Sequence, residues 1–513
     1  MEKPRRSRRG FAVGLDLRQP TVAEGLPRAE GRRSDVDSTV LAVKLIIQIP
    51  VDNDPESRRR EGPRNVKRLW RHLAVVLCSA FAAWPQTPGP AGDWPQWRGP
   101  HLDGSNRTCR HLPTQWSETE NVVWRTRLPS WAAATPIIWG DTVFVTSADE
   151  GYESLRHSGI VDRVLGGLRA AWYRSDRLLL LALDRKTGLE RWRAVVGNGN
   201  ETQTKQNMAS PSPVTDGRRV WVMTGRGTLT CLTFAGKQVW QRDIGKEHGE
   251  IGVRYGYGSS PLLAEGRLYV QVLRTGLSYV LALDGDTGEA LWRVERPTDA
   301  VEESPDSYST PTLANVRGKT QLIVSGGGYV TGHDLGTGRE MWRGGGLDPD
   351  KATDYRTIAS TLVVRDVALV PSRRRPFIAF RLDGEGPVPQ RLWSTDLGPD
   401  VPTPTTDGER LYIVDDRGIA LCLRVMDGTT VWERRRLEPG SYLASPLLAD
   451  GKVYATNEDG ETTVFKAGDR FEILSVNTLK DHTLASPAAA GENIFIRTAN
   501  YLYCLGKQRK VSD

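Results

Sequence analysis

The chain has 513 residues, of which 26% are charged, and a formal net charge of +7. Residues 1–71 hold 17 Lys and Arg against 10 Asp and Glu, so they account for the whole excess and the remaining residues are neutral overall. The composition therefore fits a large globular domain, and its high net charge does not predict a nucleic-acid-binding protein.

The N-terminal segment has the layout of an export signal that lies unusually deep in the chain. Basic residues at 67–71 precede an apolar run at 73–84, which is too short to span a membrane comfortably and ends in a small-residue cleavage pattern. We expect residues 1–60 to be either a long basic leader or an over-extended start, residues 61–84 to be a signal peptide, and residues 85–120 to form a Trp-rich arm. This layout predicts export to the periplasm or the cell surface.

A twelve-residue pattern is repeated one hundred residues apart in the middle of the chain. Residues 181–192 and 281–292 are identical at seven of twelve positions. The apolar start of each copy predicts a buried strand, and Asp184 can accept backbone N–H bonds from the turn that it opens. Gly188 supplies the positive φ that closes the turn, and Trp192 lies on a second strand and packs against a neighbouring sheet.

Degraded copies of this pattern follow along the chain. The upstream strand of each copy starts with a small residue, often followed by Pro, at intervals of about 40 to 75 residues. These eight starts lie at 134–136, 209–211, 259–261, 309–311, 359–361, 402–404, 444–446 and 485–487. The Trp position of the pattern is occupied by Trp192, Trp240, Trp292, Trp342, Trp393 and Trp432, and we expect Leu474 to take it in the last full copy. In each copy we expect this residue to pack between neighbouring sheets. Such a period, with several short strands in each unit, predicts a β-propeller.

The last copy, at 485–506, has no Trp strand because the chain ends there. The segment at 121–126 has the missing character and contains Trp124. We expect this strand to complete the last blade and close the ring, which removes the free sheet edges. The predicted fold is therefore all-β, an eight-bladed propeller over residues 121–506 followed by a tail at 507–513.

These motifs resemble the pyrroloquinoline-quinone-type repeat, Ala-x-Asp-x-x-Thr-Gly-x-x-x-Trp. The resemblance is full at 182–192 and 282–292, good at 334–342 and partial elsewhere within 121–506. The segment Asp-Trp-Pro-Gln-Trp-Arg-Gly-Pro at 93–100 is similar to the opening of secreted propellers of this family from planctomycete-type bacteria. The resemblance implies an eight-bladed propeller, in agreement with the count of strand starts. Its two branches are quinoprotein alcohol and glucose dehydrogenases, and non-catalytic propellers that include an outer-membrane assembly lipoprotein.

The dehydrogenase branch implies a calcium-bound quinone in the central funnel, a catalytic Asp and, in the alcohol dehydrogenases, two adjacent cysteines. The sequence has no adjacent cysteines and no Cys-x-x-Cys-His haem motif. Asp184, Asp284 and Asp334 occupy turn positions of the repeat. We therefore expect no catalytic, cofactor or metal residues, and keep pyrroloquinoline quinone with calcium as the alternative.

The five cysteines predict structural roles. Cys231, Cys422 and Cys504 stand at the repeat position of a small buried residue, in different blades, so we expect neither disulfides nor a metal site. Cys109 lies in the arm and has no evident partner. Cys78 follows Leu where a lipoprotein signal needs a small residue, so we expect cleavage without lipidation.

In each copy a loop connects the strand that contains the Trp to the first strand of the next copy. These loops are predicted to emerge on one face, around the channel mouth. They are rich in Tyr and Arg, which are favoured in interfaces, although any single one of these residues could be ordinary solvated loop polarity. A longer loop at 149–176 could form a short amphipathic helix. The candidate binding face comprises Lys205, Asn207, Arg254, Tyr255, Tyr257, Glu302, Glu303, Asp306, Tyr308, Tyr355, Arg356, Tyr442 and His482.

The sequence thus favours an exported, non-catalytic propeller that acts as a protein-binding or scaffold module in the cell envelope. We expect it to be a monomer that binds other envelope proteins or peptides, without nucleic acid and without a transmembrane span. The alternatives are a quinone-dependent alcohol or sugar dehydrogenase and an envelope propeller that binds carbohydrate or peptide.

Overall fold

The computed structural model describes residues 92–149, 176–203, 205–373 and 375–507. The leader and the signal segment predicted at 1–60 and 61–84, the start of the arm, and almost all of the loop at 149–176 lie outside these residues. The described residues all belong to one unit, which spans residues 83–513. Among them, no helix combines the length and the apolar character that a membrane crossing requires.

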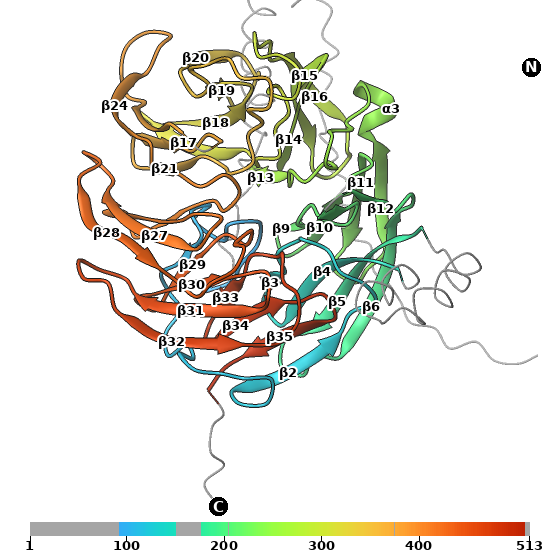
Figure 1. Ribbon diagram of the computed structural model, residues 1–513. Helices are drawn as coiled ribbons and strands as arrows, with labels where there is room; N and C mark the ends of the chain where they lie inside the picture. The colour runs from blue at the N-terminus through green and yellow to red at the C-terminus, as the bar shows by residue number, and fades with distance from the viewer. Residues whose placement is uncertain (1–91, 150–175, 204, 374, 508–513) are drawn as a thin grey trace, which may run out of the picture. The chain divides into compact units, whose positions relative to one another are not determined.

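The described residues form eight four-stranded antiparallel blades, arranged in a ring (Figure 1). The first four blades, each in order from the inner to the outer strand, are β3 (Ile137–Trp139), β4 (Thr142–Ala148), β5 (Leu178–Asp184) and β6 (Glu190–Gly197); β9 (Val214–Thr215), β10 (Arg219–Met223), β11 (Thr228–Thr233) and β12 (Gln238–Asp243); β13 (Leu262–Ala264), β14 (Arg267–Arg274), β15 (Leu277–Asp284) and β16 (Ala290–Glu295); and β17 (Thr312–Val316), β18 (Lys319–Gly326), β19 (Tyr329–Asp334) and β20 (Glu340–Gly344).

The remaining blades continue the same order. They are β21 (Leu362–Val364), β22 (Val367–Val370), β23 (Phe377–Arg381) and β24 (Gln390–Thr395); β25 (Thr405–Thr406), β26 (Arg410–Val414), β27 (Ile419–Arg424) and β28 (Thr430–Arg436); β29 (Leu447–Ala449), β30 (Lys452–Thr456), β31 (Glu461–Lys466) and β32 (Ile473–Thr478); and β33 (Ala488–Ala490), β34 (Asn493–Arg497) and β35 (Tyr501–Leu505) with β2 (Val122–Arg127). A short hairpin of β7 (Thr202–Gln203) and β8 (Gln206–Asn207) and the helix α3 (Ile244–His248) lie in connections. The predicted eight-bladed propeller is confirmed.

Closure of the ring follows the prediction. β2 pairs antiparallel with β35, and Trp124 lies opposite Cys504 in the register. This is the same pairing that places Trp192 opposite Ala182 in the first blade. The N-terminal strand therefore completes the eighth blade, and its Trp takes the same place as the Trp of a blade that the chain builds in one piece.

At five blade junctions of the described structure, the Trp of one blade packs on the turn glycine of the next blade. A Cβ atom added to Gly188 would lie 2.6 Å from the Trp124 ring, and one added to Gly338 would lie 2.4 Å from the Trp292 ring. The Trp124 indole N–H also donates to the carbonyl of Arg185, over 2.8 Å. Glycine is therefore required at the turn both for its positive φ and for the space that the Trp occupies.

The predicted turn and core roles of Asp and Cys are confirmed. Asp184 Oδ1 accepts the backbone N–H of Thr187 over 2.8 Å, and the hydrogen bonds from Arg191 and Thr187 hold the pKa of Asp184 below its ordinary value. Cys231, Cys422 and Cys504 are buried free thiols. Burial raises the pKa of each of these thiols to about 12, so they are unreactive side chains of the core.

The predicted inter-blade role of Leu474 is wrong. Phe465 lies opposite Ile473, eight residues further along the chain, whereas the equivalent pair of the first blade, Leu183 and Glu190, is seven residues apart. The turn of the seventh blade is thus one residue longer, and Ser475 takes the Trp position opposite Val464.

Trp116 of the N-terminal arm supplies the ring that the seventh blade lacks. It is buried and stacks on Tyr454 of β30, with ring centroids 6.2 Å apart. Its backbone N–H donates to Asn477 Oδ1 of β32 over 2.9 Å. The arm, which lies outside the repeat, therefore covers this part of the blade.

Trp342 keeps its place between blades but does not donate to the following blade. Its indole N–H donates to Gln321 Oε1 of its own blade over 2.7 Å. The ring can turn inward because Gly332 stands where six other copies have Ala or Cys and the seventh blade has Val464: a Cβ at this position would lie 2.1 Å from the Trp342 ring.

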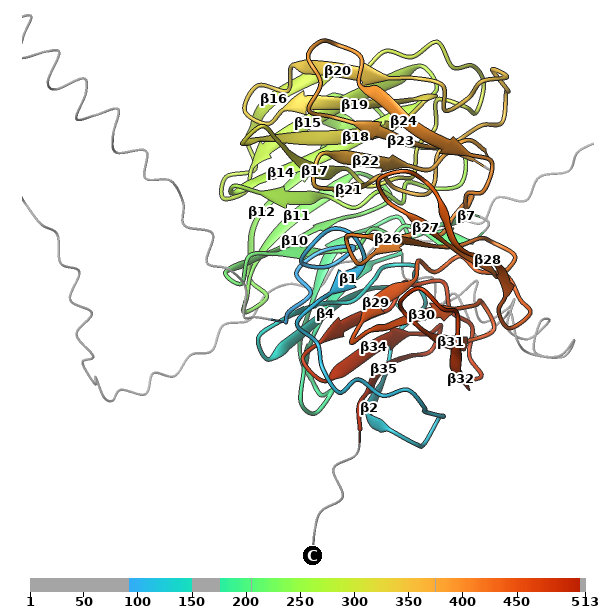
Figure 2. The ribbon, with the colours of Figure 1, turned by 90° about the vertical axis from the view of Figure 1, so that its left-hand side faces the viewer.

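The arm crosses the channel and joins several blades. Its strand β1 (Ser105–Asn106) pairs parallel with β29, as Figure 2 shows from the side. Arg98 is buried and donates to the carbonyls of Pro404 and Pro446, in the sixth and seventh blades. Burial lowers the pKa of its guanidinium to about 9. The arm therefore acts as a cross-link that closes one end of the channel.

Candidate functional site at the channel mouth

A ring of hydroxyl groups surrounds the channel where the inner strands begin. At seven of the eight blade junctions, the backbone N–H of one blade donates to a Ser or Thr hydroxyl of the next blade over 2.9–3.0 Å. The accepting residues are Ser212, Ser260, Thr310, Ser360, Thr403, Ser445 and Ser486. Each hydroxyl accepts in these bonds, so its own proton remains available as a donor.

These hydroxyl residues explain why the predicted strand starts contain a small residue that is often followed by Pro. In six of these seven blades the ring residue is the middle member of the tripeptide that predicted the strand start. In the second blade it is Ser212, directly after the predicted start at 209–211. The sequence pattern predicted these positions only as strand starts, and their role as a hydrogen-bonded link around the channel was missed.

A cavity of about 450 Å³ lies at the ring, between the arm and the loops of the mouth. Six of the seven ring hydroxyls line it, together with Trp97 of the arm. The arm contacts residues that follow the ring along the inner strands, such as Thr215, whereas the loops precede the ring. Trp97 therefore lies at the closed end of the cavity, and a ligand would enter from the loop face.

Four residues of the predicted binding face line this cavity: Lys205, Tyr255, Tyr308 and Arg356. The Arg356 guanidinium lies 4.9 Å from the centre of the Tyr255 ring. The Tyr308 hydroxyl accepts the backbone N–H of Tyr255 over 3.1 Å, so the two tyrosines are held together. The loops of the third, fourth and fifth blades thus form one cationic and aromatic surface.

Glu303 orients the arginines of this surface. Its two carboxylate oxygens accept from Arg356 over 2.9 Å and from Arg254 over 2.8 Å. The Glu303 side chain is only 9% exposed and does not line the cavity, whereas Arg254 is exposed at the rim. The pairing fixes the position of Arg356, which itself lines the cavity.

Asp306 supports the loops without facing the ligand space. Its carboxylate accepts the backbone N–H of Thr275 over 3.0 Å and that of Arg254 over 3.4 Å. The side chain is buried, and burial raises its pKa above the ordinary value. Asp306 is therefore a positioning residue of the loop.

Lys205 reaches the mouth from the connection between the first and second blades. Its ammonium forms an ion pair of 2.6 Å with Glu458, which lies in the seventh blade. The Lys205 side chain is half-exposed. This pair holds the second cation at the cavity and joins the connection between the first and second blades to the seventh blade.

The structure corrects three residues of the predicted binding face. Tyr257, Tyr442 and Asn207 are almost fully buried and cannot contact a partner directly. The hydroxyls of Tyr257 and Tyr442 donate to the carbonyls of Gln271 and Glu438, and burial raises the pKa of Tyr442 to about 12. The Asn207 amide donates to the carbonyl of Trp131 over 2.7 Å. The side chains turn inward because each completes the core or the backbone hydrogen bonds of its loop.

The other three predicted residues lie around the mouth but do not line the cavity. Glu302 is exposed, and its carbonyl accepts from Thr275. Tyr355 is half-buried and donates to the carbonyl of Arg375. His482 is half-exposed, and its carbonyl accepts the backbone N–H of Ala499.

The cavity is lined largely by groups that can donate hydrogen bonds. Among the described residues that line it are two cations, Lys205 and Arg356, and no carboxylate. The ring hydroxyls add further hydrogen-bond donors, and Trp97, Tyr255 and Tyr308 add aromatic surface. Within the described part of the chain, no group of three or more His, Cys, Asp and Glu side chains is arranged to hold a metal ion.

Comparison with known proteins agrees with the repeat architecture. The family model described as outer membrane protein assembly factor BamB matches residues 175–434, about half of the chain. A comparison with curated proteins found no match.

Solved structures resemble the chain in fold. A europium-containing methanol dehydrogenase is 11% identical with a TM-score of 0.58, over 81% of this chain and 98% of that one. A quinohemoprotein alcohol dehydrogenase from Comamonas testosteroni is 12% identical with a TM-score of 0.55, and the match covers 84% of this chain and 82% of that one. Sqt1 from Saccharomyces cerevisiae is 11% identical with a TM-score of 0.54, and the match covers 77% of this chain and 100% of that one. At such identities these likenesses concern the fold alone.

By the family match and the repeat, the chain belongs to the PQQ-like repeat β-propeller family, which includes the outer membrane protein assembly factor BamB.

Proposed function

We propose that this chain is a non-catalytic binding module of the bacterial cell envelope, and that its channel mouth holds an acidic segment of a partner protein. The observation that carries the proposal is the donor set of the cavity. Two cations, six hydroxyls of the ring and three aromatic rings line a cavity of about 450 Å³, without a carboxylate among the described lining residues. Such a site has space for one or two carboxylate side chains and supplies the charge that they need.

Arg356 is the main anchor of this proposal. Its guanidinium is oriented in advance by Glu303 and by the Tyr255 ring, so little side-chain freedom is lost when a carboxylate binds. The Lys205 ammonium can exchange its pair with Glu458 for a partner carboxylate. The aromatic rings bury the aliphatic part of the partner side chains.

The quinone-dependent alternative does not fit the residues of this cavity. A calcium ion is held by carboxylate and carbonyl oxygens, and a dehydrogenase of this kind also needs a carboxylate base. The described cavity lining offers cations and neutral hydroxyls in these places. The carboxylates that contact its cations, Glu303 and Glu458, lie outside the lining and are already ion-paired. We therefore derive no reaction through a quinone.

The proposed location rests on two independent supports. The family description refers to outer-membrane protein assembly. The sequence pattern at 61–84 predicts an export signal. Both agree with a module that meets its partners outside the cytoplasm.

The proposal is tested by titrating the purified chain into fluorescently labelled hexaglutamate, with hexalysine as the reference peptide. We expect saturable binding of hexaglutamate only, which weakens as salt rises. Exchange of both cavity cations, Lys205→Gln with Arg356→Gln, should weaken it by about tenfold or more, because hydrogen bonds to charged groups are the strong ones. The matched control, Lys186→Gln with Lys237→Gln, removes the same charge from exposed turns and should leave binding within about twofold.

Unchanged binding by the cavity variant would contradict the site. A second measurement addresses the class of function: the chain is incubated with calcium and pyrroloquinoline quinone and assayed for dye reduction with alcohols and sugars. We expect no turnover. Stoichiometric quinone binding with turnover would overturn the non-catalytic proposal.

A further inference from the structure

A second layer of side chains lies next to the hydroxyl ring at the channel mouth. It consists of the residues two positions before each ring hydroxyl, or before the equivalent Thr135 of the first blade, and all eight of them line the cavity. In blade order they are Ala133, Ser210, Gly258, Tyr308, Ile358, Val401, Leu443 and Leu484. Residues two apart in an extended chain point to the same side, which explains why this layer and the hydroxyl ring face one space.

This second layer is asymmetric. The first three blades contribute small residues to it, whereas the last four blades contribute larger aliphatic side chains, here called the apolar collar: Ile358, Val401, Leu443 and Leu484. These four blades are consecutive in the ring, so the collar occupies one side of the mouth (Figure 1). Each collar side chain is only half-buried, which leaves apolar surface that a ligand can cover.

A cation lies next to the collar. Arg356 and Ile358 flank Thr357, whose backbone pairs with Ser307 in a short parallel bridge. Thr357 is buried, whereas both flanking side chains line the cavity, as alternation along an extended segment requires. Alternate residues of such a segment are about 7 Å apart. A carboxylate bound to Arg356 would therefore lie beside the apolar surface of Ile358.

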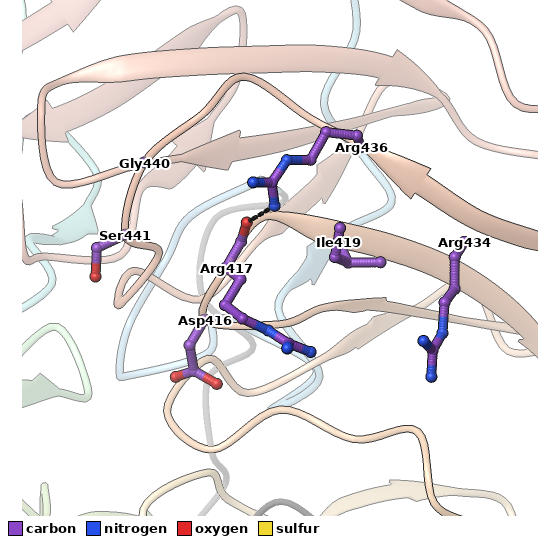
Figure 3. Close-up of a pocket in the computed structure, with 7 residues that line it drawn as sticks. All are labelled: Asp416, Arg417, Ile419, Arg434, Arg436, Gly440 and Ser441. Carbon is purple, nitrogen blue, oxygen red and sulfur yellow. Dashed lines mark hydrogen bonds between the residues drawn. The ribbon is translucent and has the colours of Figure 1, made fainter.

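The recess next to the collar carries charges of both signs. Val401 and Leu443 also line this recess of about 590 Å³, together with three arginines and four aspartates, namely Arg375, Arg417, Arg434, Asp396, Asp400, Asp415 and Asp416. Figure 3 shows the side chains of Asp416, Arg417 and Arg434 pointing the same way. Opposite charges in one space compensate each other, so this recess does not select a carboxylate as the channel mouth does.

The closed end of the cavity favours the end of a chain over a segment that passes through. Trp97 of the arm lies at that closed end. Successive side chains of an extended chain point to opposite sides, so an internal glutamate and its apolar neighbour would not both enter the cavity. The last residue of a chain, by contrast, carries a carboxylate and its side chain on the same Cα atom.

Building on the proposed binding of an acidic segment, we propose that the bound segment is the C-terminal end of a partner protein. Its terminal carboxylate binds Arg356, and the large apolar side chain of its last residue packs against the apolar collar. The small residues of the first three blades leave the space through which the rest of the segment leaves the cavity toward the loop face.

The test compares three N-terminally labelled hexapeptides in titrations with the full chain, with fluorescence anisotropy as the readout. They are five glutamates followed by leucine, leucine followed by five glutamates, and hexaglutamate. The peptide that ends in leucine should bind about tenfold more tightly than the other two, because only its last residue combines the carboxylate with an apolar side chain. Amidation of its C-terminus should weaken its binding by about tenfold, since the charge-assisted contact with Arg356 is lost.

A collar variant tests the apolar contact. Leu443→Ala with Leu484→Ala should weaken binding of the leucine-terminated peptide by about tenfold and leave hexaglutamate within about twofold, which also shows that the variant is folded. The matched control, Leu189→Ala with Leu291→Ala, trims two leucines that are 70% and 46% exposed on other blades. It should leave the binding of both peptides within about twofold.

The peptide comparison on the unmodified chain separates this proposal from the proposed function. Equal affinity of the leucine-terminated peptide and its reversed isomer, or no effect of amidation, would overturn the C-terminal assignment, while saturable hexaglutamate binding would still support the acidic-segment site. Failure of hexaglutamate to bind would contradict the proposed function itself. Octanoate tests a free carboxylic acid as the occupant: displacement of the labelled peptide at a lower concentration than the unlabelled peptide requires would contradict a protein partner.

Discussion

The glycine that receives the Trp of the preceding blade can be tested within a single blade. Gly338 and Gly318 both belong to the fourth blade and have nearly equal positive φ angles, 74° and 77°. A Cβ at Gly338 would lie 2.4 Å from the Trp292 ring, whereas one at Gly318 meets no atom within 4 Å. Gly338→Ala and Gly318→Ala therefore impose the same backbone strain, but only Gly338→Ala places a Cβ against the Trp292 ring of the preceding blade.

The expected free energies follow from these contacts. The left-handed conformation costs a residue with a Cβ about 1–2 kcal/mol, which should be the whole effect of Gly318→Ala. Gly338→Ala must also displace Trp292, and overpacking of this kind costs a further 1–3 kcal/mol, roughly. Displacement weakens the 3.3 Å hydrogen bond from the Trp292 indole to the carbonyl of Leu335 as well, for about another 1 kcal/mol. The two variants should therefore differ by about 2–4 kcal/mol.

The assay is equilibrium unfolding in urea, followed by far-UV circular dichroism and by tryptophan fluorescence. The midpoint of Gly338→Ala should lie well below that of Gly318→Ala, and both should lie below that of the unmodified chain. If the two variants lost the same free energy of unfolding within about 0.5 kcal/mol, the packing of Trp292 on Gly338 would contribute nothing beyond the turn conformation. That result would refute the prediction.

Three more predictions concern closure, the arm and a buried histidine. Trp124→Ala should lower the free energy of unfolding by about 3–5 kcal/mol, while Val123→Ala on the same strand, 46% exposed, should cost far less; equal midpoints in urea would contradict closure by β2. Arg98→Met should destabilise by about 2–5 kcal/mol and speed proteolysis between the arm and the propeller, because two buried proline carbonyls lose their donor, and unchanged stability would contradict the cross-link. Burial lowers the pKa of His333 below its ordinary 6.5, so its contribution is fully present above that pH and is lost as the pH falls through the lower folded value. Stability measured by thermal unfolding between pH 7 and 5 should therefore fall less steeply for His333→Gln, by up to about 1.4 kcal/mol per pH unit, and identical slopes would contradict this.

The repeat carried most of the fold information because its signals are local. Asp184, Gly188 and Trp192 each act within one turn or on the adjacent blade, so their spacing was enough to predict the blades and the closing strand with Trp124. Leu474 was wrong because one extra residue in a turn changes the register of the next strand without a clear mark in the sequence. Trp116 was missed as the replacement ring because it lies in the arm, outside the period of the repeat.

The candidate site was predicted less completely than the fold. The loops were correctly placed at the channel mouth, where Tyr255, Tyr308 and Arg356 meet. Loop residues such as Tyr257 turn inward because a Tyr can satisfy its hydroxyl on a buried carbonyl, and this choice depends on packing that the sequence does not display. The hydroxyl ring was hidden for a related reason: Ser or Thr before Pro has the character of a turn, and its cross-blade hydrogen bond appears only when the blades are assembled.

Hydrogen–deuterium exchange of the full chain, with and without saturating hexaglutamate, tests the central claim most directly. We expect slower exchange in the mouth loops at 253–258, 304–310 and 355–358, since these backbones hold Tyr255, Tyr308 and Arg356 around the cavity. The protection should disappear in the variant Lys205→Gln with Arg356→Gln. Unchanged exchange in these loops under saturating peptide, with protection only elsewhere on the propeller, would contradict the assignment of the channel mouth as the binding site.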